Sequence, residues 1–462
     1  MRYLPTGRIA GALAAQLPSC WKKRIFRPSG CWTESNALFV PVMCDLVACK
    51  PRLTQYVDKI PRLTMQRKEK EETMKPIADR MSRLGMETAF EVLARAKALE
   101  AQGKEVIHME IGEPDFDTPN YIKQAAKDAL DQGFTHYTAS SGIMEVRQTI
   151  ADYIAETRAI PVKAENVVVV PGGKPIMFYV ITSLVNPGDE VIYPNPGFPI
   201  YESMINFMGG VAVPLPLREE LEFSFDIKEF KSLVTPKTKL IIINSPGNPC
   251  GGVMTKTDVE AVAEMALKYD CWVLSDEIYS RILYEGEHFS ITQLPGMQER
   301  TIILDGFSKT YAMTGWRLGY GVMNTELAGW TTKLMNNSNS CTSAFTQIAG
   351  AAALKGDQTE SANMVAEFRC RRDVLVDGLN QIPGISCRRP HGAFYVFPNV
   401  KGLGKSTKEI ADLLLYEAGI ATLSGTAFGK YGEGYLRFSY ATSMENIRKA
   451  LVRIREVVAK LR

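Results

Sequence analysis

This 462-residue sequence lacks a long apolar run and a Cys-x-x-Cys pair, and it has little net charge. Each of these features excludes a class of function or partner. It has no run of 18 or more apolar residues, so we expect no membrane partner. The nine cysteines include no Cys-x-x-Cys pair, which argues against a metal site or a disulfide framework and favours a reducing compartment, the cytoplasm. The net charge of +3 is small for this length, so we expect no nucleic-acid partner.

The composition that remains is that of an ordinary globular protein. Hydrophobic residues make up 45% of the chain and charged residues 23%. A chain of this length forms one large domain or two to three ordinary ones, and it can bury a sizeable core.

The first 73 residues differ in character from the rest of the chain. Residues 1–50 hold seven basic and only two acidic residues, together with four of the nine cysteines. We predict that residues 1–73 are an N-terminal extension, either disordered or translated upstream of a true start near Met65 or Met74. Two alternatives stay open, because the apolar stretch 9–17 resembles a secretory signal and the acid-poor start is typical of an organellar presequence.

Short apolar runs recur through the middle of the chain and lack the alternation of half-exposed strands. Such runs predict strands that are buried on both faces of a parallel sheet. Helical stretches separate them, which predicts a doubly wound, mostly parallel α/β domain over residues 113–340. The runs are 167–170, 191–193, 211–213, 240–243, 272–274 and 302–304.

The flanking segments predict a smaller α+β domain, made of residues 75–112 together with 341–462. A helix stop at Gly103 ends the first of its expected helices. The expected elements are helices over 78–101, 360–381, 406–418 and 443–461 and strands over 106–111 and 393–397.

Lys309, in Ser308-Lys309-Thr310, follows one of these buried strands. Ligands of α/β proteins bind at the carboxyl ends of parallel strands. A lysine amine held there among apolar neighbours is desolvated, which lowers its pKa and makes it nucleophilic toward an aldehyde. Arg317, eight residues on, could pair with a phosphate. The alternative for Lys309 alone is a solvated surface lysine.

Other polar motifs also stand at strand ends. Asp276 follows the strand 272–274, where a carboxylate either caps a helix or keeps a pyridine nitrogen protonated. Tyr279 could then donate to an oxygen on the same ring. The stretch 244–249, Asn-Ser-Pro-Gly-Asn-Pro, is by itself only a turn signal. The stretch 171–174, Pro-Gly-Gly-Lys, is by itself a weak phosphate-loop signal.

Together and in this order, these motifs resemble the class I, aspartate aminotransferase-like family of enzymes that depend on pyridoxal 5'-phosphate (PLP). The resemblance covers about residues 75–460, and its most specific part is 308–319, Ser-Lys-Thr-Tyr-Ala-Met-Thr-Gly-Trp-Arg-Leu-Gly. Residues 112–119 resemble the bacterial and archaeal branch of the family. The resemblance implies the PLP-dependent fold type I, PLP as the cofactor and a homodimer.

The resemblance also implies a role for individual residues. Lys309 would form a Schiff base with PLP and act as the general base, with Asp276 at the pyridine nitrogen and Tyr279 at the 3-oxygen as further catalytic groups. Tyr137 would reach the phosphate of the neighbouring subunit. Contacts to the cofactor would also come from Gly172, Gly173, Lys174, Phe198, Asn248, Ser308 and Arg317. Contacts to the substrate would come from Gly112, Lys174, Asn248 and Arg437, whose planar fork suits a carboxylate.

The sequence departs from the family pattern at several positions. Family members often carry threonine where Cys250 stands and serine where Gly306 stands, so one hydroxyl contact to the phosphate that the family makes is not assured here, and Ser308 could supply it instead. Pro175 follows Lys174, and proline is tolerated in the first turn of a helix.

The predicted function is that of a transaminase, which moves the amino group of an L-amino acid to a 2-oxo acid. If Lys174 recognises an acidic side chain, the donor is aspartate or glutamate. A PLP-dependent β-lyase or an aromatic or other aminotransferase on the same fold is the alternative, because cofactor motifs do not separate these reactions. A PLP-sensing regulator is a further alternative, but residues 1–73 show no helix pair for DNA binding.

Overall fold

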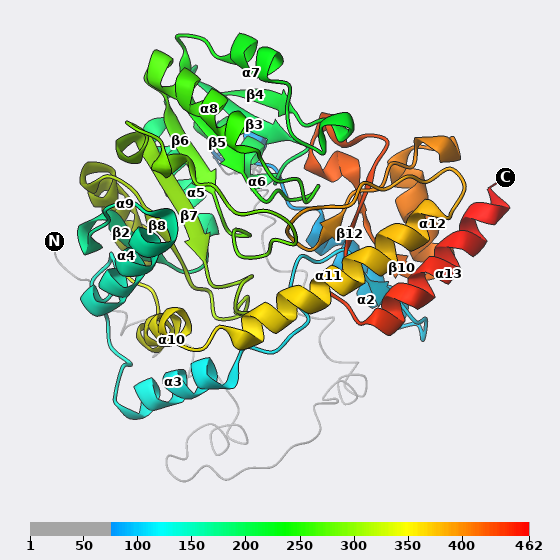
Figure 1. The fold of residues 1–462 in the computed structure, drawn as a ribbon, viewed down its shortest axis with the longest axis horizontal. Coiled ribbons are helices and arrows are strands. Elements are labelled where there is room, and N and C mark those ends of the chain that lie inside the picture. Colours follow the sequence, from blue (N-terminus) through cyan, green and yellow to red (C-terminus); the bar gives the residue numbers. More distant parts are fainter. Residues whose placement is uncertain (1–74, 462) are drawn as a thin grey trace, which may run out of the picture. The chain divides into compact units, whose positions relative to one another are not determined.

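Seven strands form the central sheet of the computed structural model, which describes residues 75–461 (Figure 1). Strand β8 pairs antiparallel with both of its neighbours, and the other neighbouring pairs are parallel. All six predicted strands are present, so the mostly parallel sheet is confirmed, and β8 is the strand that sequence reasoning missed. Their order across the sheet is β2 (Val167–Val170), β8 (Gly319–Val322), β7 (Thr301–Gly306), β6 (Trp272–Asp276), β5 (Thr238–Asn244), β3 (Glu190–Asn195) and β4 (Val211–Pro216).

Helices cover both faces of this sheet, as a doubly wound fold requires. Successive residues of a strand point to opposite faces, so Val168 packs with one group of helices and Val167 and Val169 with another. The first group is α5 (Lys174–Leu184), α6 (Ile200–Met208) and α9 (Thr325–Asn339). The second is α3 (Asn120–Asp131), α4 (Met144–Arg158), α7 (Ile227–Leu233), α8 (Lys256–Tyr269) and α10 (Ala344–Lys355).

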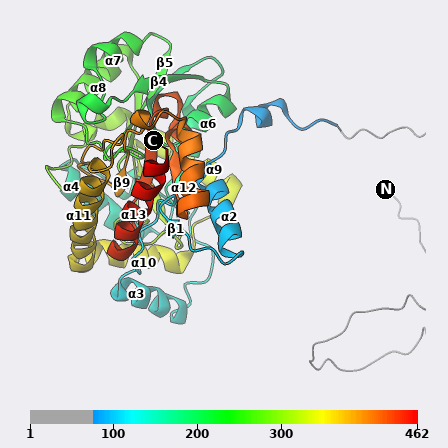
Figure 2. The same cartoon turned by 90° about the vertical axis from the view of Figure 1, so that its right-hand side faces the viewer.

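A second group of elements is built mainly from the C-terminal part of the chain. In Figure 2, α11, α12 and α13 lie next to one another, and both α11 and α12 pack against α13. The helices are α2 (Ala89–Glu100), α11 (Thr359–Asn380), α12 (Thr407–Ala418) and α13 (Met444–Lys460). The short strands are β1 (Ile107–His108), paired with β10 (Ile420–Ala421), and β12 (Leu436–Ser439), which lies between β11 (Leu423–Ser424) and β9 (Tyr395–Val396).

The predicted helix over 78–101 is wrong in its first half. A 3-10 turn, η3 (Asp79–Arg83), is followed by extended chain, and α2 begins only at Ala89. The backbone N–H of Gly85 donates to Ser203 Oγ of α6 over 2.9 Å, so a tertiary contact holds the chain where helix propensity alone would continue the helix. The helix stop is correct, since Gly103 has a φ of +82°.

The structure tests only some of the predictions about domains, the N-terminal extension, membrane spans and metal sites. Residues 76–462 form one compact unit, and the domain boundaries at 112 and 340 stay a prediction. The predicted extension over residues 1–73 lies outside the described residues. In residues 75–461, no helix is long and apolar enough to cross a membrane, and no group of acidic, cysteine and histidine side chains could hold a metal ion.

Candidate active site

A cavity of about 480 Å³ opens where the carboxyl ends of the central strands meet the C-terminal elements. Asn244, Asp276 and Leu304 reach it from β5, β6 and β7, and Tyr395 and Arg437 reach it from β9 and β12. All but two of the predicted site residues line it. Those lining residues are Gly112, Gly173, Lys174, Phe198, Asn248, Asp276, Tyr279, Ser308, Lys309, Arg317 and Arg437.

Lys309 lies in the loop after β7 and is largely buried. Its Nζ donates to the carbonyl oxygen of Gly112 and lies 5.8 Å from the centre of the Phe394 ring. Burial lowers the pKa of the Lys309 ammonium to about 8, even though the nearby charge of Glu113 acts in the opposite direction. About a tenth of Lys309 is therefore an uncharged amine at pH 7, far more than for an ordinary lysine, and this is the form that attacks a carbonyl carbon or accepts a proton.

Asp276 ends β6 and is only 4% exposed. Its Oδ2 accepts a hydrogen bond of 2.5 Å from the hydroxyl of Tyr201, and its Oδ1 accepts one of 3.3 Å from the backbone N–H of Ile278. Burial raises the pKa of Asp276 to about 6, because these donors only partly replace the lost water. A cationic N–H inside the cavity would offset this desolvation.

Tyr279 and Asn248 lie on the same wall of the cavity. The Tyr279 hydroxyl is 2.7 Å from that of Tyr395, and burial raises the pKa of Tyr279, so it remains a neutral donor. The side chain of Asn244 supports this wall, since it donates to the carbonyl of Asp276 over 3.0 Å and accepts from the backbone N–H of Asn248 over 2.8 Å.

Arg437 is a buried guanidinium whose N–H groups are only partly used. It is 4% exposed, its Nη1 donates to Asn248 Oδ1 over 3.1 Å, and its Nη2 donates to the carbonyl of Glu110. Among the described residues, its Nε has no hydrogen-bond partner. Tyr395 and Phe428 cover its faces, with ring centres 4.5 and 4.9 Å away. A buried cation with an unused N–H suits a bound carboxylate.

A cradle for an anion lies at the start of α5. Gly172 has a φ of +85°, and a Cβ on it would lie 2.1 Å from Arg317 Nη2, so only glycine lets the arginine approach. Gly173 is the N-cap of α5, where Pro175 has no N–H and the N–H of Ile176 donates to the carbonyl of Gly173 over 3.1 Å, which leaves the N–H groups of Gly173 and Lys174 to face an anion. Arg317 itself has a φ of +53°, a strained conformation of the kind that gathers at binding sites.

Positions 306 and 308 are the two places where a hydroxyl could contact an anion in this cradle, and they differ in how much room a side chain has. A Cβ on Gly306 would lie 3.0 Å from the Cα of Gly319 on the paired strand β8, which explains the glycine at a position where relatives often have serine. Ser308, two residues on, lines the cavity and is 8% exposed. These residues fit PLP: an anion cradle, a desolvated lysine and a buried carboxylate lie around one cavity.

Two predicted residues do not line the cavity. Gly172 lies directly behind it, against Arg317. Tyr137 lies in a separate surface hollow and is 89% exposed, so within one chain it contacts none of the other predicted residues of the site.

Four residues of the site escaped the sequence reasoning. The hydroxyls of Tyr201 and Tyr395 bond Asp276 and Tyr279, and only Tyr395 had a sequence signal, since it places a hydroxyl inside the predicted strand 393–397. Glu87 and Phe90 line the cavity from the segment that leads into α2. No motif marked them.

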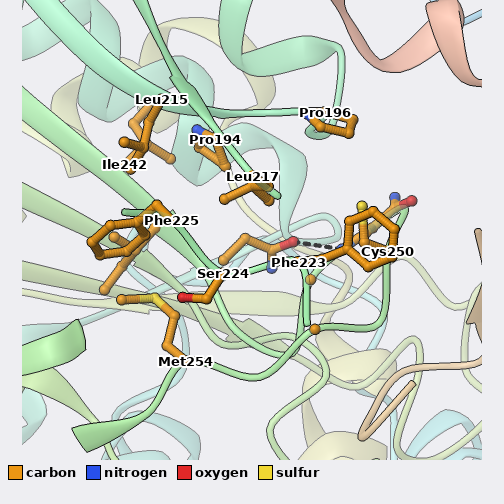
Figure 3. Close-up of a pocket in the computed structure, with 15 residues that line it drawn as sticks. Pro194, Pro196, Leu215, Leu217, Phe223, Ser224, Phe225, Ile242, Cys250 and Met254 are labelled. Carbon is orange, nitrogen blue, oxygen red and sulfur yellow. Dashed lines mark hydrogen bonds between the residues drawn. The ribbon is translucent and has the colours of Figure 1, made fainter. Parts of the chain in front are cut away.

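A second, much smaller hollow lies behind the wall formed by Asn244 and Asn248 (Figure 3). Its volume of about 30 Å³ holds no more than a water-sized molecule. Cys250 is buried beside it, and burial raises the pKa of this thiol well above its usual range, so it is not a reactive nucleophile. The larger cavity around Lys309 is therefore the candidate active site.

Known proteins share both the sequence and the fold of this chain. The family model for aminotransferases of class I and II matches residues 104–454. An aspartate aminotransferase of Musicola paradisiaca is 39% identical over 84% of this chain and 98% of its own length. An aromatic-amino-acid aminotransferase of Thermococcus litoralis is 40% identical over 78% of this chain and 93% of its own length.

The fold comparison agrees with these sequence relatives. The crystal structure of an aspartate aminotransferase from Thermus thermophilus with maleate superposes with a TM-score of 0.79 at 37% identity. The match covers 83% of this chain and 100% of the other. Relatives at similar identity thus include enzymes named for acidic and for aromatic amino acids.

Proposed function

Because the chain belongs to the class I and II aminotransferase family and is a PLP-dependent aminotransferase, we propose that its amino donor is L-aspartate or L-glutamate. The acceptor is a 2-oxo acid. The observation that supports this most is the set of cations around the cavity, where the buried Arg437 has an unused N–H and Lys174 lines the same space. A dicarboxylic amino acid carries two groups that such cations bind.

The cavity residues divide the work of holding the cofactor. PLP, when bound, supplies an aldehyde and an electron-withdrawing pyridine ring that stabilises the charge left by loss of a proton. Asp276 would hold the proton of the ring nitrogen, Tyr279 and Asn248 would bond the 3-oxygen, and Phe198 would cover the ring. The phosphate would lie in the cradle made by Gly172, Gly173, the start of α5 with Lys174, Ser308 and Arg317.

The remaining groups bind and convert the substrate. Lys309 would hold the cofactor through its amine and, when that amine is free, would take the proton from the α-carbon of the substrate. Its amine suits this task because its pKa of about 8 lies close to physiological pH. Arg437 would hold the α-carboxylate by two parallel hydrogen bonds, and the backbone at Gly112 would approach the same group. Lys174 would bind the carboxylate of the side chain.

A homodimer is part of this proposal, through Tyr137. This side chain is 89% exposed, and its hollow shares Cys341 and Thr342 with an adjoining hollow that is lined by Arg317. A second copy could therefore bring its Tyr137 to the phosphate side of the first. We also propose the cytoplasm as the location, or an organelle if residues 1–73 are a presequence, since the five cysteines between residues 75 and 461 are free.

A panel of amino donors with 2-oxoglutarate tests the proposal. Formation of glutamate from aspartate, with the matching change in cofactor absorbance, is the expected result. Fumarate and ammonia from aspartate would instead show elimination, alanine and carbon dioxide would show decarboxylation, and either result without glutamate would overturn it. Preference for tyrosine or phenylalanine over aspartate would support the aromatic alternative.

A further inference from the structure

One acidic side chain stands among the cations of the active-site cavity. Glu87 lies two residues before α2 and lines the same space as Lys174, Lys309, Arg317 and Arg437. Its negative charge acts on two groups of the site. Burial lowers the pKa of both Lys309 and Arg437, and the charge of Glu87 acts to raise both. An acidic group at this place repels a dicarboxylic substrate, so its presence among the cations needs an explanation.

Glu87 is paired with the lysine that we assign to the substrate's side chain. Lys174 Nζ lies 2.5 Å from Glu87 Oε2, and the two side chains are 45% and 23% exposed. The ammonium also lies 5.3 Å from the centre of the Phe198 ring and 5.9 Å from that of Phe90. A half-exposed ion pair of this kind is weak, so a ligand can replace one partner.

The surroundings of the pair are apolar. Phe90 is 59% exposed at the cavity, which is unusual for a phenylalanine unless it contacts a ligand or a partner. Ala89, Met177 and Phe198 line the same cavity. With the charge of Lys174 neutralised by Glu87, these side chains form a surface on which a large apolar side chain can pack.

We propose that Glu87 is a specificity-determining residue that lets this enzyme accept two classes of amino donor in one cavity. When an amino acid with a large apolar side chain is bound, Glu87 keeps its partner Lys174. When an acidic amino acid is bound, the substrate carboxylate takes the place of Glu87 on Lys174. This inference rests on the proposed function, because it assumes that the side chain of the donor lies near Lys174.

The pairing has an energetic reason in each case. An apolar side chain that covered an unpaired ammonium would remove its water without supplying a counter-charge, which is costly. Glu87 removes that cost. An acidic side chain supplies the counter-charge itself, but it must compete with Glu87, so the residue favours apolar donors at the expense of acidic ones.

The variant Glu87→Gln tests this proposal, because it removes the charge and keeps the size. We would measure kcat/KM of the holoenzyme for aspartate and phenylalanine, and the equilibrium binding of succinate and 3-phenylpropanoate, which lack an amino group and cannot react. The wild type should bind both compounds. In E87Q the preference for acidic over apolar ligands should rise about tenfold in both measurements, as one lost charge interaction predicts.

A matched control and a second variant complete the test. Glu91→Gln makes the same change four residues on, at an exposed position in the first turn of α2, and it should leave the preference as in the wild type. Glu87→Asp keeps the charge but shortens its reach, so it should give a smaller shift in the same direction, and it serves if E87Q does not fold.

The possible failures are distinguishable. If the wild type transfers no amino group from any donor, the proposed function is wrong. If it does transfer amino groups but does not bind 3-phenylpropanoate, the inference about Glu87 is overturned. The same holds if E87Q shifts the preference by less than about twofold, well short of the expected tenfold.

Discussion

Asp276 and Glu277 are neighbours in the sequence, yet they lie in opposite kinds of environment. Asp276 lines the active-site cavity, and one tyrosine hydroxyl and one backbone N–H donate to its carboxylate. Glu277 lies in a fully buried polar group that we call the Arg158 cluster, made of Arg158, Ser275, Glu277, Ser280, His288, Ser290 and Asp305.

The pKa values of the two neighbouring carboxyls, Asp276 and Glu277, are shifted in opposite directions. Burial acts to raise the pKa of Glu277, but the charges of His288 and Arg158 hold it well below its usual range. Arg158 Nε donates to Glu277 over 2.8 Å, and Ser290 Oγ donates to it over 2.6 Å. In the cavity burial prevails, so that the pKa of Asp276 rises to about 6 and that of Lys309 falls to about 8.

The difference separates structural charges from functional ones. In the Arg158 cluster, Glu277 has both Arg158 and His288 as counter-charges, so this carboxylate is already paired within the fold, although burial still raises the pKa of Asp305 to about 6. The cavity leaves Asp276, Lys309 and Arg437 short of partners. Ligands that bring a cationic N–H, an aldehyde and a carboxylate would supply the missing partners of these three groups. Holding such groups ready for a ligand lowers the stability of the protein without the ligand.

Replacing Lys309 should have the largest effect on turnover. Lys309→Ala removes both the nucleophile and the general base, so we expect kcat to fall by at least ~10⁴-fold, the upper end for loss of a general base. The absorbance of the covalently bound cofactor should also disappear. Steady-state assays and a spectrum of the purified variant measure this, and substantial residual turnover would contradict the assignment.

A second substitution of Lys309 should show how much its unpaired charge destabilises the folded protein. In the folded protein the pKa of Lys309 is about 8, against an ordinary 10.5, so folding is disfavoured while the lysine is protonated. Lys309→Met should therefore stabilise the apoprotein at pH 7 by at most about 3 kcal/mol. The gain should shrink as pH rises from 8 to 10.5, because the wild type becomes more stable across that window.

The paired substitutions Glu277→Gln and Asp276→Asn test the comparison most directly. In E277Q the buried Arg158 loses its closest counter-charge, so we expect a loss of about 3 kcal/mol of unfolding free energy. In D276N the buried charge is removed, so the apoprotein should be more stable than the wild type at pH 7, by at most about 3 kcal/mol, while kcat should fall by about 10²-fold, as for loss of one preorganised electrostatic group. Urea denaturation and kinetics measure both. If D276N proved the less stable of the two, our separation of the two regions would be wrong.

Arg437→Lys changes another group of the cavity and should have a smaller effect on activity. Lysine keeps the charge but loses the planar fork, so it cannot hold a carboxylate by two parallel hydrogen bonds. We expect kcat/KM to fall by about 10- to 100-fold, the equivalent of one charged hydrogen bond, with most of the change in KM. Arg453→Lys is the control, because Arg453 pairs with Glu105 outside the cavity.

The fold was predictable from the sequence wherever burial was uniform. Strand β2 is a run of four valines that are all fully buried, and β-branched runs of this kind predict strands well. Strand β8, Gly319–Val322, escaped because close contacts require its glycines. A Cβ on Gly319 would lie 2.7 Å from the backbone nitrogen of Gly173, so the packing selects against the residues that mark a strand.

The site was predictable where its residues follow a strand directly. Lys309 and Asp276 stand just past β7 and at the end of β6, so the topology of a parallel sheet brings them to one edge. Glu87 and Tyr201 could not be found in this way. Each reaches the site through a tertiary contact, with Lys174 and with Asp276, that no local pattern of the sequence expresses.

The smallest predicted effect is a shift on the pH axis, and it tests the desolvation of Lys309 without any substitution. Cofactor attachment needs the uncharged amine, so its rate should rise with pH and reach half of its maximum near the pKa of Lys309. We expect that midpoint at about 8, well below the ordinary 10.5. Stopped-flow absorbance after mixing apoprotein with PLP between about pH 6.5 and 10 measures it. A midpoint near 10.5 would show that Lys309 is as well solvated as a surface lysine, and the cavity would then not share the desolvation of the Arg158 cluster.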